Sequence, residues 1–257
     1  MNAGKVFAVV GAAAAVCVLG AVGYLVVDAR SGSGDAQDVN TSAQSEAVAV
    51  QGPSSGYQVA YGAGGSSVTS TGVPVGYGQD CGSAVAAATA YAVAVVSPLA
   101  DPAGWDRSSY SDMLAELAGG VSTTAGQQST EHLLDLLDAA PAATTAIPDA
   151  QLYLQDSLYR VSSCQTGSAA SVDLALVTGG TAAGTPFGGL MPVSVDVVWS
   201  GGDWRLSVLD PFEEWAEWSA MSTAPGSGWV PPLGSQGRSA VVAAGGAGWQ
   251  EFTNAGD

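Results

Sequence analysis

A long apolar stretch stands near the start of the chain. Residues Val6–Val27 carry no charge, and Lys5, Asp28 and Arg30 flank them. As a helix rising about 1.5 Å per residue, this stretch is roughly 33 Å long, and the hydrocarbon core of a bilayer is about 30 Å thick. The pattern predicts a transmembrane helix. A cleaved signal peptide is the alternative, although the stretch is longer than the apolar region of an ordinary signal peptide.

Residues 28–71 show neither the helical period of 3.6 nor the strand period of two. They are rich in Ser, Gly, Ala, Gln and Val, a composition typical of a flexible linker. A similar composition returns near the end of the chain, so we expect residues 222–257 to form a loosely ordered tail. One folded domain is then expected over residues 72–221.

Three amphipathic helices are predicted at the start of this domain. The first runs from Cys81 to about Ser97, with Asp80 as its cap and Pro98 as its stop. The other two have apolar residues at helical spacing, which are Tyr110, Met113, Leu114 and Leu117 in the second helix and Leu133, Leu136, Leu137 and Ala140 in the third.

Capping residues mark the ends of the second and third helices. Ser108 or Ser109 is expected to cap the second helix, and Gly119-Gly120 to end it. Thr124 and Gln127 have the spacing of a capping box, so Thr124 is expected to cap the third helix, which is expected to stop before Pro141.

In the next segment apolar residues alternate with polar ones, as they do in half-buried strands. Strands are predicted from Gln151, from Ser171, over Val193–Trp199 and over Trp204–Val208. A short turn of Ser, Gly, Gly and Asp separates the last two, so we expect an antiparallel hairpin with its two tryptophans side by side. Gly179–Gly189 is expected to be a long hairpin loop. The order predicts an α+β domain in which three helices pack on a four-stranded antiparallel sheet.

The last hairpin carries the pattern W-x-x-G-D-W-x-L at Trp199–Leu206. This pattern, following three helices, resembles the last two strands of the nuclear transport factor 2 superfamily, whose fold is cystatin-like. The resemblance implies a strongly curved, cone-shaped sheet that wraps around its helices. It brings no catalytic residues with it, and many members of the superfamily are not enzymes.

Three further segments extend the resemblance, namely VPVGY at Val73–Tyr77, AVAAATAYA at Ala84–Ala92 and GWVP at Gly228–Pro231. With the apolar stretch, they are similar to membrane-anchored accessory proteins of actinobacterial integrative and conjugative elements. Such proteins are similar in layout to the bitopic assembly subunits of type IV secretion systems. The resemblance implies a role in conjugative transfer or secretion, with envelope or transfer-machinery proteins as partners.

Charge bears on the side of the membrane that the domain occupies. The chain has 23 acidic and 6 basic residues, and 22 acidic and 4 basic remain without Lys5, Asp28 and Arg30. Because cytoplasmic loops tend to be basic, we expect a single-pass protein with residues 1–5 in the cytoplasm and the acidic domain outside the cell membrane. The net charge of −17 also argues against a nucleic-acid partner, which needs clustered Lys and Arg.

The cysteines and the single histidine limit the chemistry. Cys17 lies within the apolar stretch, so Cys81 and Cys164 are the pair outside it. In an oxidising compartment we expect a disulfide between them, with two unpaired thiols as the alternative. His132 is assigned to an exposed polar face of the third helix. With so few soft ligands, no metal or cofactor is expected.

Enzymes of the superfamily named above work in the mouth of the cone with Asp, His, Tyr or Arg side chains. The candidates here are Asp156, Tyr159, Arg160, Asp173 and Asp196. Strand alternation directs Asp173 and Asp196 away from the apolar face and toward solvent, so we do not expect an enzyme. Three glutamates after Asp210-Pro211 are interpreted as residues of the first turn of a helix, namely Glu213, Glu214 and Glu217.

Large aromatic residues gather after the last strand. They are Phe212, Trp215, Trp218 and Trp229, and they are either core residues or a partner-binding rim, because aromatic anchors are common at interfaces. We predict a non-enzymatic, membrane-anchored scaffold or protein-interaction module and leave a homo-oligomer open. The alternatives are a small-ligand binder or a hydrolase- or isomerase-type enzyme that uses the cone cavity, and a cell-wall carbohydrate binder that uses exposed tryptophans.

Overall fold

A computed structural model describes residues 58–60, 62, 64–100, 104–144, 151–182, 185–211, 217–224 and 234–254. Residues 1–5, the expected transmembrane helix over residues 6–27 and the larger part of the expected linker lie outside these ranges. So do three of the four aromatic residues of the expected rim, Phe212, Trp215 and Trp229.

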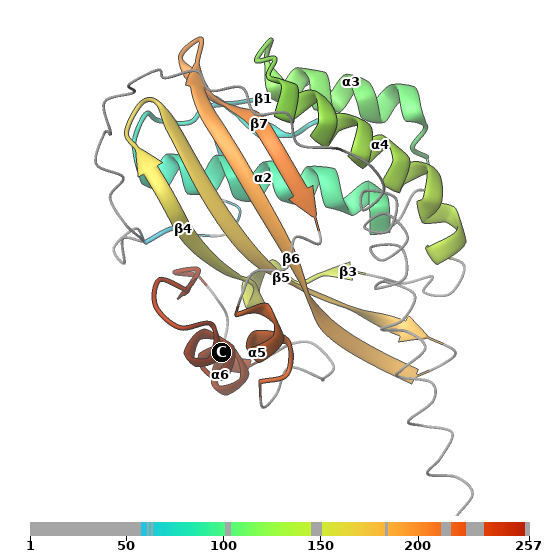
Figure 1. The fold of residues 1–257 in the computed structure, drawn as a ribbon, viewed down its shortest axis with the longest axis vertical. Coiled ribbons are helices and arrows are strands. Elements are labelled where there is room, and N and C mark those ends of the chain that lie inside the picture. The colour runs from blue at the N-terminus through green and yellow to red at the C-terminus, as the bar shows by residue number, and fades with distance from the viewer. Residues whose placement is uncertain are drawn as a thin grey trace, which may run out of the picture.

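The described residues form an α+β fold in which three long helices precede an antiparallel sheet, as predicted (Figure 1). The helices are α2 (Cys81–Ala100), α3 (Arg107–Ala118) and α4 (Thr124–Thr144). The long strands are β4 (Leu158–Gln165), β5 (Ala169–Ala182), β6 (Thr185–Ser200) and β7 (Asp203–Pro211). The remaining elements are β1 (Ser67–Val68), β2 (Pro74–Val75), β3 (Gln151–Leu152), the 3₁₀ helix η1 (Leu154–Asp156), α5 (Trp218–Ser222), α6 (Gly234–Gly245) and β8 (Gln250–Glu251).

The main sheet has six strands where four were expected. Their order is β7-β6-β5-β4-β8, and β3 also pairs with β5. The predicted strand from Gln151 is divided by η1 into β3 and β4. The other additional strand, β8, is two residues long, which is too short for an alternating pattern. The expected loop over Gly179–Gly189 is also wrong, because β5 and β6 stay paired as far as Ala182 and Thr185. Hydrogen bonds between the two strands keep this glycine- and threonine-rich stretch extended.

Two helix ends and two caps differ from the expectation. α2 continues past Pro98, and α4 past Pro141, although a proline at either position has no N–H to donate to the carbonyl four residues earlier. The cap of α4 is Thr123 and not Thr124, since the Thr123 hydroxyl accepts a hydrogen bond from the amide of Gly126 at 2.9 Å.

The cap of α3 is Asp106, which accepts a hydrogen bond from the amide of Ser109 at 2.7 Å and donates its own amide to the Ser109 hydroxyl at 3.1 Å. The predicted stop is confirmed, since Gly119 ends α3 in the left-handed conformation with φ 55°.

The three long helices pack on one face of the sheet (Figure 1). The predicted apolar faces of α3 and α4 are confirmed, because every residue named for them is at most 5% exposed: Tyr110, Met113, Leu114, Leu117, Leu133, Leu136, Leu137 and Ala140. The β6–β7 hairpin is also as predicted. Trp199 lies opposite Trp204, with ring centroids 5.5 Å apart, and Gly201 and Gly202 form the turn with positive φ.

The folded unit includes residues before position 72, where the linker was expected to continue. Val59 is 5% exposed and belongs to the core, and its carbonyl accepts a hydrogen bond from the amide of Thr253 at 2.9 Å. The strands β1 and β2 pair with each other. The carboxylate of Asp203 accepts hydrogen bonds from the amides of Gly76 and Tyr77 at 2.8 and 2.9 Å. These bonds join the segment that follows β2 to β7.

The C-terminal segment packs on part of the opposite face of the sheet (Figure 1). We refer to the buried residues here as the second cluster, which consists of Leu158, Ala175, Val177, Met221, Ala224, Val241 and Trp249. The expectation of a loosely ordered tail is therefore wrong for residues 234–254, which form α6 and β8. Small residues allow close packing here, since a Cβ on Gly245 would lie 2.6 Å from the Trp249 ring.

Within the described ranges, α2 is the one helix that is long and apolar enough to cross a membrane, over Cys81–Leu99. However, 61% of its apolar window is buried inside the protein, and its side chains form the centre of the core together with the sheet. We therefore assign α2 as the core helix of the domain.

Candidate functional site

The two cysteines that the sequence singled out are joined by a disulfide. Cys81 begins α2 and Cys164 lies near the end of β4, with their Cα atoms 6.1 Å apart. The bridge connects the helical layer to the sheet across a sequence separation of 83. Disulfides persist in oxidising compartments, so this bridge bears on where the domain works.

A charged cluster lies on the face of the sheet on which the C-terminal segment packs. Arg160 in β4 pairs with Asp173 in β5 at 2.7 Å and with Glu217, the residue before α5. The hydroxyls of Ser162 and Ser194 also donate to the Asp173 carboxylate. Asp173 is 7% exposed, so the expectation that it faces solvent is wrong. The reason is that α5 and α6 pack on this face of the sheet as well.

A second arginine, Arg238 in α6, is buried on the same face. It donates to Asp156 in η1 at 3.1 Å and to Glu251 in β8 at 3.0 Å. The side chains of Arg238 and Asp156 are 2% and 1% exposed. Arg160 lies 5.0 Å from the ring centroid of Trp249, a distance typical of a cation–π contact. Both arginines therefore fasten the C-terminal segment to the sheet.

Sequence reasoning missed the part played by Arg238 and the pairing of Arg160. The available signal was the scarcity of basic residues, since the chain has 6 of them against 23 acidic ones. Among the described residues, all four arginines form ion pairs with carboxylates. In such an acidic chain, a basic residue within an otherwise apolar segment indicates a structural ion pair.

Of the candidate catalytic residues, Arg160 and Asp173 are brought together as an ion pair, whereas Asp156, Tyr159 and Asp196 have other partners. The carboxylates of Asp156 and Asp173 are buried and held by arginines, whereas a general acid or base must reach its substrate within about 3 Å. Tyr159 belongs to the core on the helical side, where burial raises the pKa of its phenol. Asp196 accepts a hydrogen bond from the hydroxyl of Ser171 at 2.6 Å. These residues stabilise separate parts of the fold.

Bulky side chains occupy the space between the helices and the sheet. Tyr91, Tyr110 and Trp204 are each 0% exposed. Both tyrosine hydroxyls donate to backbone carbonyls at 2.7 Å, Tyr91 to Trp204 and Tyr110 to Val95. Burial raises the pKa of both phenols. The tyrosines therefore act as neutral, hydrogen-bonded core residues.

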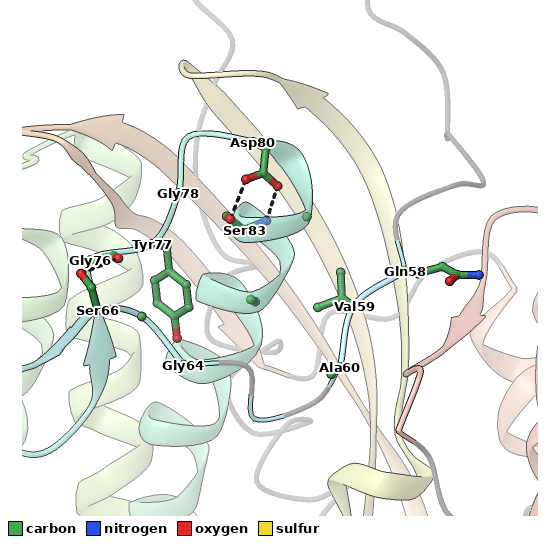
Figure 2. A pocket seen from close by; sticks show the side chains of 13 residues that line it. Gln58, Val59, Ala60, Gly64, Ser66, Gly76, Tyr77, Gly78, Asp80 and Ser83 are labelled. Carbon is green, nitrogen blue, oxygen red and sulfur yellow. Dashed lines mark hydrogen bonds between the residues drawn. The ribbon is translucent and has the colours of Figure 1, made fainter.

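An open pocket of about 330 Å³ lies at the edge of the fold, between residues 58–60 and 64–66 on one side and the start of α2 on the other (Figure 2). Its walls are mostly glycine, serine and alanine. The carboxylate of Asp80 on its rim accepts hydrogen bonds from the amide of Ser83 at 2.9 Å and from the hydroxyl of Ser83 at 2.8 Å. These bonds hold the pKa of the Asp80 carboxyl below its usual range. The pocket is large enough for a small polar molecule, but the Asp80 carboxylate on its rim already caps α2.

Tyr77 lies beside this pocket and is unusual for a buried tyrosine (Figure 2). Its side chain is 6% exposed, and its hydroxyl has no hydrogen-bond partner. Burial, and after it the negative charge of Asp203, raises the pKa of Tyr77 to about 12. The phenol is therefore neutral at physiological pH.

The described tryptophans pack against the fold. Trp218, the one described residue of the expected rim, is partly buried against the second cluster. Trp204 donates its indole N–H to the carbonyl of Gly78 at 2.8 Å, and Trp199 packs on the core with its ring at 74° to that of Trp204. A sugar-binding platform needs exposed, coplanar rings, and this pair does not form one.

His132 is half-buried on α4, beside Glu131, which pairs with Arg107 at 3.4 Å. Glu217, interpreted from the sequence as a helix-start residue, precedes α5 and binds Arg160, while Glu213 and Glu214 lie outside the described residues. Across the part of the chain that the structure describes, no group of three or more His, Cys, Asp or Glu residues could hold a metal ion.

Comparison of the chain with protein-family models, with curated proteins and with solved structures found no match. Fold and site therefore define the class of protein. It is an α+β domain that is cross-linked by a disulfide, filled between its helices and its sheet, and partly covered on the second face of the sheet by a C-terminal segment held by buried arginines.

Proposed function

We propose that this chain is a membrane-anchored, extracytoplasmic protein-interaction module that serves as a non-enzymatic scaffold in a conjugative transfer or secretion apparatus. The accompanying fold assignment is the cystatin-like fold of the nuclear transport factor 2 superfamily. The W-x-x-G-D-W-x-L hairpin and the order of helices before strands support that assignment.

The filled space between the helices and the sheet is the observation that carries the proposal. Enzymes of the resembling superfamily act in this part of the fold, whereas here Tyr91, Tyr110 and Trp204 occupy it and are fully buried. The polar groups on the other face of the sheet are bound to one another. A domain built in this way contacts other molecules through its outer surface.

Two features support the proposed location. The disulfide between Cys81 and Cys164 suits an oxidising compartment outside the cytoplasm. The apolar residues Val6–Val27 are long enough to anchor the chain in the membrane. Protease added to intact cells whose wall has been removed should therefore digest the domain. Complete protection of the domain, or its release into the medium, would contradict the proposed topology.

Cross-linking in native membranes tests the proposed partners. With the tagged full-length chain as bait, we expect recovery of transport or envelope proteins, and a loss of more than about fivefold in Trp218→Ala, the size of effect expected for an aromatic interface anchor. Trp105→Ala is the matched control. Trp105 is also partly buried, but it packs on Tyr110 on the helical side. Failure of every variant, including the unchanged chain, to recover such proteins would contradict the proposal.

A further inference from the structure

The strands β5 and β6 extend beyond the end of β7, and β3 pairs with the other side of β5 at Thr178 and Gly179 (Figure 1). The pairing of β6 with β7 ends where Val193 lies opposite Pro211, whereas β5 and β6 remain paired as far as Ala182 and Thr185. Among the described residues, no strand pairs with the outer side of β6 beyond Val193. We refer to residues 185–192 of β6 as the free edge.

The hydrogen bonds of β5 show which backbone groups of the free edge point outward. Val177 lies opposite Leu190. The carbonyl of Val177 accepts the amide of Tyr153 at 2.8 Å, and its amide donates to the Ser157 hydroxyl at 2.9 Å, so both groups point away from β6. In an antiparallel pair, residues directly opposite each other are either both bonded across the pair or both directed outward. The amide and carbonyl of Leu190 therefore point outward, and by alternation so do those of Gly188.

Two prolines limit this outward row of groups. Pro186 and Pro192 occupy the same alternate positions and have no N–H to offer. The outward donors between them are the amides of Gly188 and Leu190. The two prolines stand symmetrically about Gly189 in the sequence. A two-fold rotation about Gly189 would therefore place Gly188 opposite Leu190 of a second copy and proline opposite proline, which makes the edge self-complementary.

Charge also favours a second copy at this edge. The whole chain has a net charge of −17, yet no charged residue stands between Asp173 and Asp196. Edge strands usually carry charges that prevent pairing with another chain, and the free edge has none. Within it, residues 188–190 are partly exposed, whereas Met191 and Pro192 are buried. Two copies of an acidic chain repel each other where their charged surfaces approach. Because this stretch of β5 and β6 carries no charge, the repulsion between two copies is weaker here.

We propose that two copies of this chain associate through the free edge of β6 as an antiparallel strand pair centred on Gly189. The amide of Gly188 donates to the carbonyl of Leu190 in the second copy, and the amide of Leu190 donates to the carbonyl of Gly188. The two-fold axis repeats both bonds, and the sheet becomes continuous across the dimer. The inference does not depend on the proposed function.

Disulfide cross-linking tests the register. On the axis, Gly189 and its copy would form a non-hydrogen-bonded pair with Cα atoms about 4.5 Å apart, within the range of about 4.4–6.8 Å that a disulfide allows. A Cβ on Gly189 meets Thr178 Oγ1 at an ordinary 3.9 Å. We expect Gly189→Cys, made in the full-length chain with Cys17→Ala, to form a linked dimer in membranes at least about tenfold faster than Val68→Cys, because pairing raises the effective concentration of the thiols. Val68 is 66% exposed on β1 and reports random collisions.

A proline and alanine pair at Gly188 separates this edge from other contacts between copies. Gly188→Pro removes an outward donor and leaves the bonds to β5 in place, as Pro186 and Pro192 do, whereas Gly188→Ala keeps the donor. In sedimentation of the detergent-solubilised full-length chain, we expect Gly188→Pro to raise the dimer dissociation constant about tenfold through the loss of two hydrogen bonds, and Gly188→Ala to change it by less than about twofold.

Three results would overturn the proposal. They are a full-length chain that stays monomeric at every concentration, a dimer that Gly188→Pro does not weaken although its circular dichroism is unchanged, and cross-linking of Gly189→Cys no faster than that of Val68→Cys. Cross-linking of Gly189→Cys to a different protein in place of a second copy would also overturn it and would assign the edge to that protein.

Discussion

Buried tyrosines show what a hydroxyl contributes with and without a partner. The hydroxyl of Tyr91 donates to the carbonyl of Trp204, whereas the buried hydroxyl of Tyr77 has no partner. Removing a bonded hydroxyl leaves a buried carbonyl unsatisfied, and removing an unbonded one relieves a desolvation cost. We therefore predict that Tyr91→Phe lowers the free energy of unfolding by about 1 kcal/mol and that Tyr77→Phe leaves it unchanged or raises it. Urea denaturation measures both, and equal losses would contradict this reading of Tyr77.

The raised pKa of Tyr77 predicts a loss of stability in alkali. Its pKa is about 12 in the folded protein, against 10.0 for an unperturbed tyrosine, because of burial and then the charge of Asp203. The folded state holds this proton more tightly than the unfolded state, so the stabilisation is complete below pH 10.0 and is lost as the pH rises toward about 12. Over this range the free energy of unfolding falls as the pH rises. In Tyr77→Phe we expect the slope of this fall to be smaller by the contribution of about one proton. An unchanged slope would refute the assignment.

The disulfide between α2 and β4 is expected to contribute much of the stability of the domain. On the chain-entropy model, a bridge across a separation of 83 residues stabilises by up to about 4.5 kcal/mol, and a typical domain has a net stability of about 5–15 kcal/mol. We predict that Cys81→Ala combined with Cys164→Ala loses most of this amount in chemical denaturation. Reductant should lower the stability of the unchanged chain equally and leave that of the double variant unaffected.

Periodic patterns predicted the parts of the fold that are long and local. The apolar residues of α3 and α4 recur over about two helical turns, and a four-residue turn between alternating strands predicts the β6–β7 hairpin. The arrangement of the second face was not predictable in this way. Asp173 alternates with apolar neighbours as an exposed residue would, and only the distant Arg160 and Glu217 explain its burial. Alternation cannot reveal that both faces of a sheet are covered.

The attachment of the C-terminal segment to the sheet depends on Arg238. Its replacement leaves Asp156, which is 1% exposed, as a buried charge without this partner, a change that typically costs about 3–5 kcal/mol. We predict that Arg238→Gln removes hydrogen-exchange protection from α6 and β8 before it affects α2. Arg238→Met combined with Asp156→Leu should restore most of the protection, because apolar residues can replace a buried ion pair. Full protection of α6 in Arg238→Gln alone would refute this dependence.

The bond between Cys81 and Cys164 also determines how the chain responds to tension. A pull on its two ends follows the shorter covalent route across the bridge, so residues 82–163, including α2, α3 and α4, lie in a closed loop that the pull cannot stretch. Reduction opens this loop and releases about 83 residues, or roughly 290 Å of additional extension at about 3.5 Å per residue. In an oxidising compartment, mechanical load therefore reaches the strands β5, β6 and β7 while the helical layer is bypassed.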